Sequence, residues 1–139
     1  MQYELRFFGM EHYSEARRLW SECDGVALTD ADDALNIGNF LERNTGLSFV
    51  AITGEELVGT ILCGHDGRRG FIHHLAVAPK ARRRGIASRL VAASLQSLKA
   101  NGIEKCHLLV FVNNRQGNEF WRSIGAKFRN ELGLYSLTT

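Results

Sequence analysis

Four basic side chains and a glycine stand close together between residues 80 and 85 and could hold a polyphosphate. Lys80 is followed by Arg82, Arg83 and Arg84, and Gly85 comes directly after them. Guanidinium groups form charge-assisted hydrogen bonds with phosphate oxygens, and a glycine lets a ligand approach the backbone closely. A basic run alone is most often a solvated loop. The flanking elements therefore decide whether this segment binds an anion.

A predicted strand and a predicted helix flank the basic segment. Residues 71–77 are apolar or aromatic on both faces, which predicts a central buried strand, and Pro79 ends it. From Ile86 apolar residues recur at helical spacing until a glycine ends the pattern. The first turn of such a helix has unpartnered N–H groups and roughly half a positive charge. An anion is expected there, against the backbone of Gly85, Ile86 and the small residue Ala87.

The motif R-x-x-G-x-A that begins at Arg82 matches neither the P-loop nor the Rossmann fingerprint. It resembles the acyl-CoA pyrophosphate loop of the GNAT superfamily of N-acetyltransferases, and LAVAP at residues 75–79 resembles the strand ending before that loop. A second block, Asn114 followed by FWRSIGA at residues 120–126, resembles a later segment of the same family. The two blocks stand in the family's order. The resemblance covers essentially the whole chain and is closest to small, single-domain bacterial members.

The resemblance implies an α/β fold, with a mixed, mostly antiparallel sheet whose fourth and fifth strands are parallel and splay apart, flanked by about four helices. Residues 1–139 would form a single N-acetyltransferase domain. The residue pattern agrees with this order of elements, and Asp30 is a candidate cap for the second helix. Strands are predicted at 3–8, 48–52, 57–63, 71–77 and 106–112, with two final strands turning near 131–133, and helices at 12–23, 32–44, 86–101 and 116–124.

The resemblance also implies acetyl-CoA as co-substrate, with no metal. The splayed strands would leave backbone groups near residues 75–77 free to bond the pantetheine amides, as an added strand would. Asn114 would contact the pantetheine arm, although a turn residue that makes local backbone bonds is an equal alternative. The predicted cofactor-binding residues are Leu75, Ala76, Val77, Arg82, Arg83, Arg84, Gly85, Ile86, Ala87, Asn114 and Trp121.

His73 and His74 lie on the strand beside the implied reaction centre, and either imidazole could take a proton from an ammonium group at physiological pH. Alternate residues of a strand face opposite ways, so we expect only one of the two to face the cleft. His73 shares parity with Leu75 and Val77 and lies where the serotonin N-acetyltransferase branch has one of its paired histidines. It is the predicted base. The alternative is that both are sheet histidines satisfied by backbone bonds.

The leaving thiolate has no obvious proton donor. Many relatives have a tyrosine as general acid at the position of Trp121, and an indole N–H cannot hand over a proton. Tyr135 or water could serve instead, or the thiolate could leave unassisted. Trp121 would then pack against the cofactor arm. A backbone N–H near Val77 would polarise the thioester carbonyl.

Acidic residues gather on the segment that lines the acceptor side in this family, and they would attract a cationic amine. They are Glu22, Asp24, Asp30, Asp32 and Asp33. Helix capping and solvation are an equal alternative. The acceptor is expected to be a small-molecule or peptide amine, and polyamines, amino sugars, amino acids and peptide N-termini all remain open.

Composition excludes several other classes. The 139 residues are 45% hydrophobic and 23% charged, which suits one globular domain. A net charge of +2 gives no reason to expect a nucleic acid or a membrane partner. No apolar run approaches the roughly 18 residues of a membrane span, and the N-terminus lacks a secretory signal. Three scattered cysteines without metal spacing are expected to be reduced thiols in a cytoplasmic protein.

Two alternatives to an enzyme remain. One is a non-catalytic acyl-CoA sensor or interaction module, which the missing tyrosine favours. The other is a nucleic-acid-binding domain that uses its arginines, but the near-neutral charge and the lack of interleaved aromatic and basic residues disfavour it. A homodimer through the C-terminal strands is possible.

Overall fold

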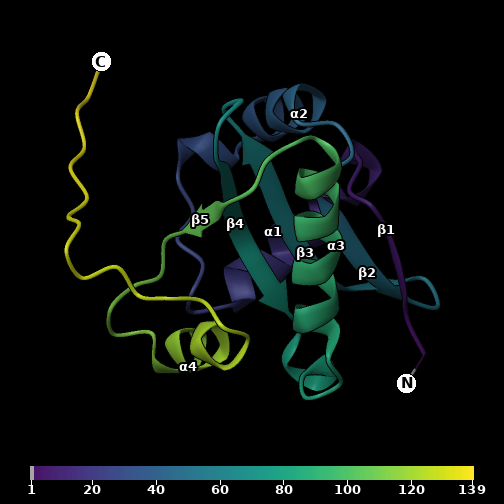
Figure 1. Cartoon of the computed structure of the whole chain (residues 1–139). Coiled ribbons are helices and arrows are strands. Elements are labelled where there is room, and N and C mark those ends of the chain that lie inside the picture. Colours follow the sequence, from purple (N-terminus) through teal and green to yellow (C-terminus); the bar gives the residue numbers. More distant parts are fainter. Residues whose placement is uncertain (1) are drawn as a thin grey trace. The chain divides into compact units, whose positions relative to one another are not determined.

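The computed structural model describes residues 2–139, which divide into two compact units. The first ends at Leu109, and the second comprises Val110–Thr139. The first unit contains the sheet and three of the α-helices, and the second contains the fourth (Figure 1).

A five-stranded sheet in the order β1-β2-β3-β4-β5 forms the first unit. Neighbouring strands are antiparallel except β4 and β5, which are parallel, as predicted. The turn between β2 and β3 contains Gly54 with φ +60°, a conformation that suits glycine. The strands are β1 (Glu4–Phe7), β2 (Phe49–Thr53), β3 (Glu56–His65), β4 (Gly70–Val77) and β5 (Cys106–Leu108).

Helices cover both faces of this sheet, with α3 in front of it and α1 behind it in Figure 1. A Cβ added at Gly59 of β3 would lie 3.1 Å from Leu90 and 3.2 Å from Ile86, so α3 packs closely there. On the opposite face the buried indole of Trp20 bonds to β3. The helices are α1 (Tyr13–Glu22), α2 (Ala34–Arg43) and α3 (Ile86–Ala100), with 3-10 turns η1 (Met10–His12), η2 (Asp30–Asp32) and η3 (Pro79–Ala81).

The second predicted helix differs from α2 at its start. Residues 30–32 form the separate turn η2, which the Thr29 hydroxyl caps by accepting a bond from the Ala31 N–H at 3.2 Å. The N-cap position of α2 is Asp33, so the prediction that Asp30 caps this helix is wrong. Asp30 and Asp33 are both acidic residues ahead of the apolar helical pattern, so the sequence does not show which of them is the N-cap residue. The turn η2 decides it, because Asp30 lies in this turn and Asp33 follows it.

A β-bulge interrupts β4 beside the two histidines. Thr60 of β3 pairs with Ala76 and Leu62 pairs with His73, so His74 and Leu75 together lie opposite one residue of β3. His74 has φ +46°, which a residue other than glycine rarely adopts. The Thr60 hydroxyl donates to the His74 carbonyl at 2.9 Å and accepts from Trp20 Nε1 at 2.8 Å. The bulge is therefore bonded to α1 through the sheet.

Pairing between β4 and β5 covers three residues of each strand and ends at Ile72 and Leu108. The predicted continuation of β5 to Val112 is wrong. In the second unit the Phe111 carbonyl accepts bonds from the Asn114 N–H and from Asn118 Nδ2, both at 3.0 Å. These bonds turn the chain into α4 (Arg115–Ser123). Residues 106–112 are mostly apolar, and this pattern does not show where pairing with β4 ends.

The prediction of two final strands near residues 131–133 is also wrong. Gly125, with φ +95°, ends α4, and residues 124–139 contain no strand in the structure. Alternating apolar residues favour a strand, but a strand forms only on a partner edge. The second unit contains no such partner among its described residues, and Phe128, Leu132, Leu134 and Leu137 are exposed.

Candidate cofactor loop and acceptor face

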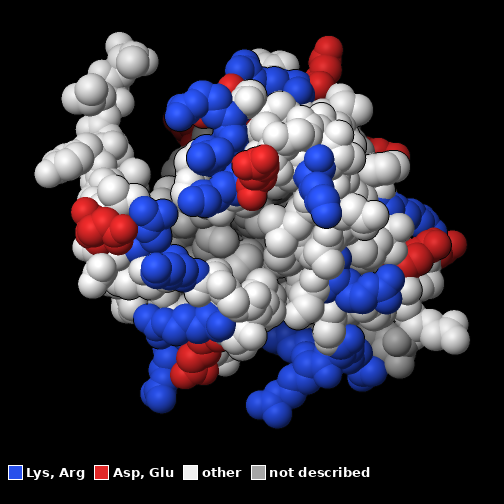
Figure 2. Space-filling view, in the orientation of Figure 1, with Lys and Arg blue, Asp and Glu red and all other residues white. Residues whose placement is uncertain are grey.

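The basic loop joins η3 to the start of α3. Arg83 has φ +65°, and Gly85, at the N-cap of α3, has φ +78° with nothing within 4 Å of an added Cβ. Arg82, Arg83, Arg84 and Gly85 are exposed, whereas the side chain of Ile86 is buried in the core. Figure 2 shows basic side chains gathered at the lower, N-terminal end of α3. The structure thus brings open backbone N–H groups and guanidinium groups to one place.

Arg82 differs from the two arginines after it. Its Nε donates to the Val77 carbonyl at 3.0 Å, which ties the loop back to the end of β4. The guanidinium also lies beside the buried Cys23 thiol. Burial raises the pKa of Cys23, while the neighbouring Arg82 acts in the opposite direction. Arg82 therefore ties the loop to β4 through this bond, and the exposed Arg83 and Arg84 are available to an anion.

The outer edge of β4 is open where the loop begins. After Ile72 this strand pairs with β3 on one side, and no strand among residues 2–139 pairs with its other side. Leu75 is half-buried, while Ala76 and Val77 are buried, so their side chains pack while their backbone remains at an edge. An extended ligand with amide groups could add to this edge as a strand would.

Both adjacent histidines lie on the face of the sheet that α1 and α2 cover. The His73 ring is 5.9 Å from the Phe40 ring of α2, and the His74 ring is 4.7 Å from that of Trp20. The expectation that only one histidine could face this side is wrong, because the bulge inserts an extra residue. For the same reason His73 shares its face with Ala76 and not with Val77. The sequence pattern did not predict the bulge.

Asp32 holds His74 in place. Its Oδ1 is 2.6 Å from His74 Nε2, and its Oδ2 accepts a bond from the Thr29 N–H at 3.0 Å. The Tyr13 hydroxyl of α1 donates to the Asp32 carbonyl at 2.7 Å. Asp32 is 6% exposed. The other acidic residues of the predicted cluster, Glu22, Asp24, Asp30 and Asp33, are exposed.

His73 has a different environment. Its ring is stacked with the Phe71 ring at 6.4 Å, and Phe40 lies edge-on to it. His73 as a residue is exposed to solvent, yet these neighbouring rings partly desolvate its imidazole. This burial lowers the pKa of His73, and the neighbouring His74 lowers it further. The Asp32 carboxylate acts on this pKa in the opposite direction. On α1, Arg17 has a buried Nη1 without a hydrogen-bond partner among the described residues.

In the second unit, Asn114 caps α4. Its Oδ1 accepts a bond from the Gly117 N–H at 3.0 Å, and a Cβ at Gly117 would come within 2.5 Å of Asn114 Nδ2. The alternative that Asn114 makes local backbone bonds is confirmed for this oxygen. Trp121 is half-buried with its ring 5.2 Å from Phe120, and Tyr135 is 95% exposed.

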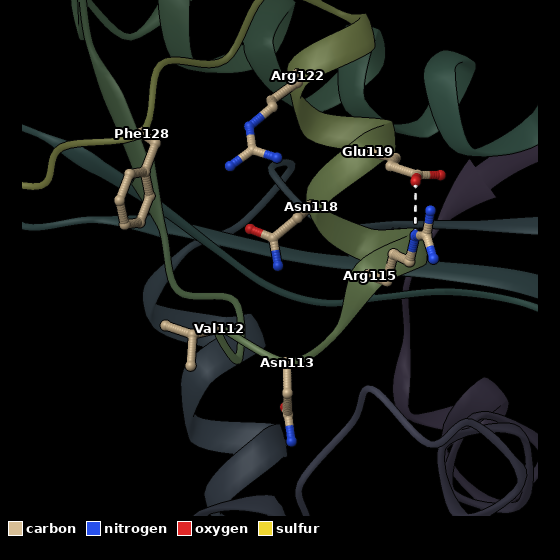
Figure 3. Close-up of a pocket in the computed structure, with 7 residues that line it drawn as sticks. All are labelled: Val112, Asn113, Arg115, Asn118, Glu119, Arg122 and Phe128. Carbon is tan, nitrogen blue, oxygen red and sulfur yellow. Dashed lines mark hydrogen bonds and ion pairs between the residues drawn. The ribbon is translucent and has the colours of Figure 1, made fainter.

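A cavity of about 380 Å³ lies within the second unit and was not expected from the sequence. Figure 3 shows Asn118 and Arg122 pointing toward it from α4, while Arg115 forms an ion pair with Glu119 at 3.2 Å. These residues recur at helical spacing, a signal that sequence reasoning could have used. The lining residues are Val112, Asn113, Arg115, Asn118, Glu119, Arg122 and Phe128.

Two further searches concern metals and membranes. Among residues 2–139, no three or more histidine, cysteine, aspartate or glutamate side chains are grouped as a metal ion would require. No helix in this part of the chain has both the length and the apolar character to cross a membrane.

Solved structures resemble this fold. An aminoglycoside acetyltransferase, AAC(6')-Iy, bound to a bisubstrate analogue superimposes with a TM-score of 0.79 and 19% identity, over 100% of both chains. The PaiA N-acetyltransferase of Thermoplasma acidophilum in complex with coenzyme A also gives a TM-score of 0.79, with 20% identity over 94% of this chain and 92% of that chain. At these identities the likeness shows the fold.

Sequence comparisons show the family. Residues 13–126 match the model of the Acetyltransferase (GNAT) family. "Acetyltransferase ECA0875" of Pectobacterium atrosepticum is 34% identical over 80% of this chain and 78% of its own length. "Acetyltransferase plu1384" of Photorhabdus laumondii is 37% identical over 80% of this chain and 77% of its own length. These matches confirm the predicted acetyltransferase, and the chain belongs to the GNAT family of acetyltransferases.

Proposed function

We propose that this GNAT acetyltransferase moves an acetyl group from acetyl-CoA to a primary amine by direct attack in a ternary complex. The observation that carries the proposal is the open edge of β4, which leads directly into the exposed loop at the N-terminus of α3. A long cofactor with amides at one end and phosphates at the other suits such a path. The two histidines lie on the same strand, on the face that α1 and α2 cover.

The loop would hold the pyrophosphate. Arg83 and Arg84 would supply charge-assisted bonds, and the N–H groups that follow Gly85 would supply the helix-terminal donors. Arg82 would position the loop through its bond to the Val77 carbonyl. The edge from Leu75 to Val77 would take the pantetheine amides, with Asn114 Nδ2 and Trp121 as proposed contacts along the arm.

In the reaction the amine nitrogen forms a bond to the acetyl carbon, the carbon–sulfur bond breaks, and CoA leaves as the thiolate. An ammonium group must first lose a proton, and a β4 histidine would take it, with His73 as the residue proposed from the sequence. A backbone N–H near Val77 would polarise the carbonyl. Tyr135 or water would protonate the thiolate.

The acceptor is proposed to be a cationic small molecule or peptide. Two solved relatives of this fold are named as aminoglycoside acetyltransferases, and one of these was solved with sisomicin. In this chain the carboxylates near α2 would attract an ammonium group. The absence of a nucleic-acid partner, the cytoplasmic location and the homodimer stay predictions.

Calorimetric titration with acetyl-CoA tests the proposal first, with CoA and 3′-dephospho-CoA as comparisons. We expect micromolar binding that survives moderate salt, because the edge and the loop share the ligand. Thiol release would then be measured with spermidine, glucosamine, alanine and trialanine. Absence of binding would contradict the proposed site. Binding without thiol release from any amine would favour the sensor alternative.

A further inference from the structure

We infer that the Asp32–His74 pair, and not His73, takes the proton from the acceptor ammonium. The inference rests on the proposed acetyl transfer and assigns one step of it. Asp32 would be a positioning residue, because it acts through His74. His74 would be the catalytic residue, because its free ring nitrogen would meet the amine.

The bond between the two residues fixes which nitrogen of His74 is available. An ionised carboxylate only accepts hydrogen bonds, so with Asp32 in that form the 2.6 Å contact requires the hydrogen to be on His74 Nε2. In a neutral imidazole the lone pair is then on Nδ1. The pair therefore presents a proton acceptor on the side of the ring away from Asp32.

Nδ1 of His74 is also accessible. It makes no hydrogen bond with another described residue, and the only buried side-chain nitrogen or oxygen without a partner among residues 2–139 belongs to Arg17. Nδ1 therefore keeps contact with solvent although the His74 side chain is only 15% exposed. An amine on the α1 and α2 face of the sheet could reach this atom directly or through one water.

The surroundings hold His74 more tightly than His73. Its ring lies 4.7 Å from Trp20, and its carbonyl accepts the Thr60 hydroxyl at 2.9 Å. Asp32 is itself fixed by the Thr29 N–H and by Tyr13. His73 contacts aromatic rings, and neither of its ring nitrogens bonds to a described residue. A base needs an orienting partner, and of the two histidines His74 has one.

The charged and titratable groups around the pair are few. On β4 the neighbour is His73, whose pKa is lowered. On α1 it is Tyr13, whose hydroxyl donates to the Asp32 carbonyl, and on the segment of Asp32 itself they are the exposed Asp30 and Asp33. The only titratable residues of α2, Glu42 and Arg43, lie in its last turn, and Trp20 and Thr60 do not titrate. Asp32 is therefore the carboxylate that contacts the His74 ring.

The step balances without another reactant. An N–H bond of the ammonium group breaks, its proton goes to His74 Nδ1, and the electron pair stays on the amine. The neutral amine then attacks the acetyl carbon, and the thiolate leaves with the electrons of the carbon–sulfur bond. The imidazolium, held by Asp32, later releases its proton to solvent.

The tautomer of His74 can be tested without cofactor or acceptor by nitrogen-15 NMR at pH 8. We expect the hydrogen on Nε2 in the wild-type protein. In Asp32→Asn the amide oxygen can still accept from the Thr29 N–H while the NH₂ group donates to His74 Nε2. The hydrogen should then move to Nδ1. A hydrogen on Nδ1 in the wild type, or a tautomer that Asp32→Asn leaves unchanged, overturns the pair.

Kinetics with acetyl-CoA and the most active amine of the panel test the role. We expect His74→Gln and Asp32→Asn to lower kcat roughly 100-fold at pH 7 and much less at pH 9, where more amine is already neutral. Acetyl-CoA affinity should stay within about twofold, because neither side chain lies in the cofactor loop. His65→Gln, at the far end of β3, is the control and should leave kcat unchanged.

Three results distinguish a failure of the inference about His74 from a failure of the proposed function. A wild-type kcat in His74→Gln, with loss of activity at low pH in His73→Gln, overturns the inference and returns the role to His73. An equal loss at every pH in His74→Gln also overturns it, because that loss indicates packing. Failure of the wild type to bind acetyl-CoA contradicts the proposed function instead, and the tautomer measurement still tests the pair.

Discussion

The indole N–H of Trp20 donates a 2.8 Å hydrogen bond to the Thr60 hydroxyl in the buried interior. That hydroxyl in turn donates to the His74 carbonyl, so one side chain satisfies a buried N–H and a partly buried carbonyl. Thr60→Val would leave both groups unpaired with little change of volume. We expect the free energy of unfolding to fall by about 2–4 kcal/mol, which denaturant unfolding would measure. Thr45→Val, at an exposed threonine, is the matched control, and an equal effect there would contradict this account.

The loop before α3 should be sensitive to both shape and charge. Gly85 has φ +78°, which a β-branched side chain resists, so Gly85→Val should distort the loop although nothing crowds its Cβ. Arg84→Glu should repel the phosphates. We expect each change to weaken acetyl-CoA binding by more than about tenfold by calorimetry, with the fold retained. Arg68→Glu, in the turn before β4, should have no effect. Unchanged affinity in the two loop variants would remove the phosphate assignment.

His73 should make stability depend on pH. Burial lowers its pKa in the folded protein below the value of about 6.5 in the unfolded chain. The unfolded state therefore binds more protons in this range, and the His73 contribution is present above pH 6.5 and lost as pH falls through the lower folded value. Thermal unfolding from pH 8 to pH 5 should show a smaller loss of stability in His73→Gln than in the wild type. Parallel curves would contradict the assigned burial.

Asn114 has two separable tasks. Its Oδ1 caps α4, and its Nδ2 is the group proposed to meet pantetheine. Asn114→Asp keeps the capping oxygen and loses the amide donor, so it should retain stability and weaken acetyl-CoA binding. Asn114→Ala should lose both, including about 1 kcal/mol of stability. Unaltered acetyl-CoA affinity in Asn114→Asp would leave Asn114 a cap alone.

The family resemblance predicts that Trp121 occupies the position of a tyrosine whose hydroxyl acts as general acid in many relatives. Trp121→Tyr would introduce a group able to protonate the departing thiolate. We expect faster thiol release, measured with a disulfide reagent at pH 7, while acetyl-CoA affinity stays similar. Trp121→Phe is the control, because it introduces a ring without a proton donor. A rate increase in both variants would trace the effect to ring size.

The strand and helix around the basic loop were predictable because each depends on local rules. Pro79 ended the strand and apolar spacing from Ile86 marked α3, and these elements formed where the pattern placed them. The family resemblance then added the parallel arrangement of β4 and β5, which the structure confirms. The roles of the individual cofactor-binding residues remain predictions.

Other parts depend on contacts distant in sequence. The bond between Asp32 and His74 joins residues 42 positions apart, and neither residue differs locally from a solvated turn acid or a sheet histidine. The face of His73 was predicted wrongly because a strand pattern assumes strict alternation. The prediction of two final strands was wrong because alternating apolar residues such as Phe128 and Leu132 form a strand only beside another strand edge.

Because of the bulge, the number of residues in β4 determines which side chains lie on each face of the sheet. Deleting His74 or Leu75 would restore strict alternation, and every residue from Gly70 to His73 would then exchange sides relative to Val77. Ile72 would leave the side that α3 covers, and the polar ring of His73 would enter it. An alignment that gaps this strand by one position therefore implies that the residues before the gap lie on the opposite face of the sheet. Such a gap would change the residues on both faces of β4.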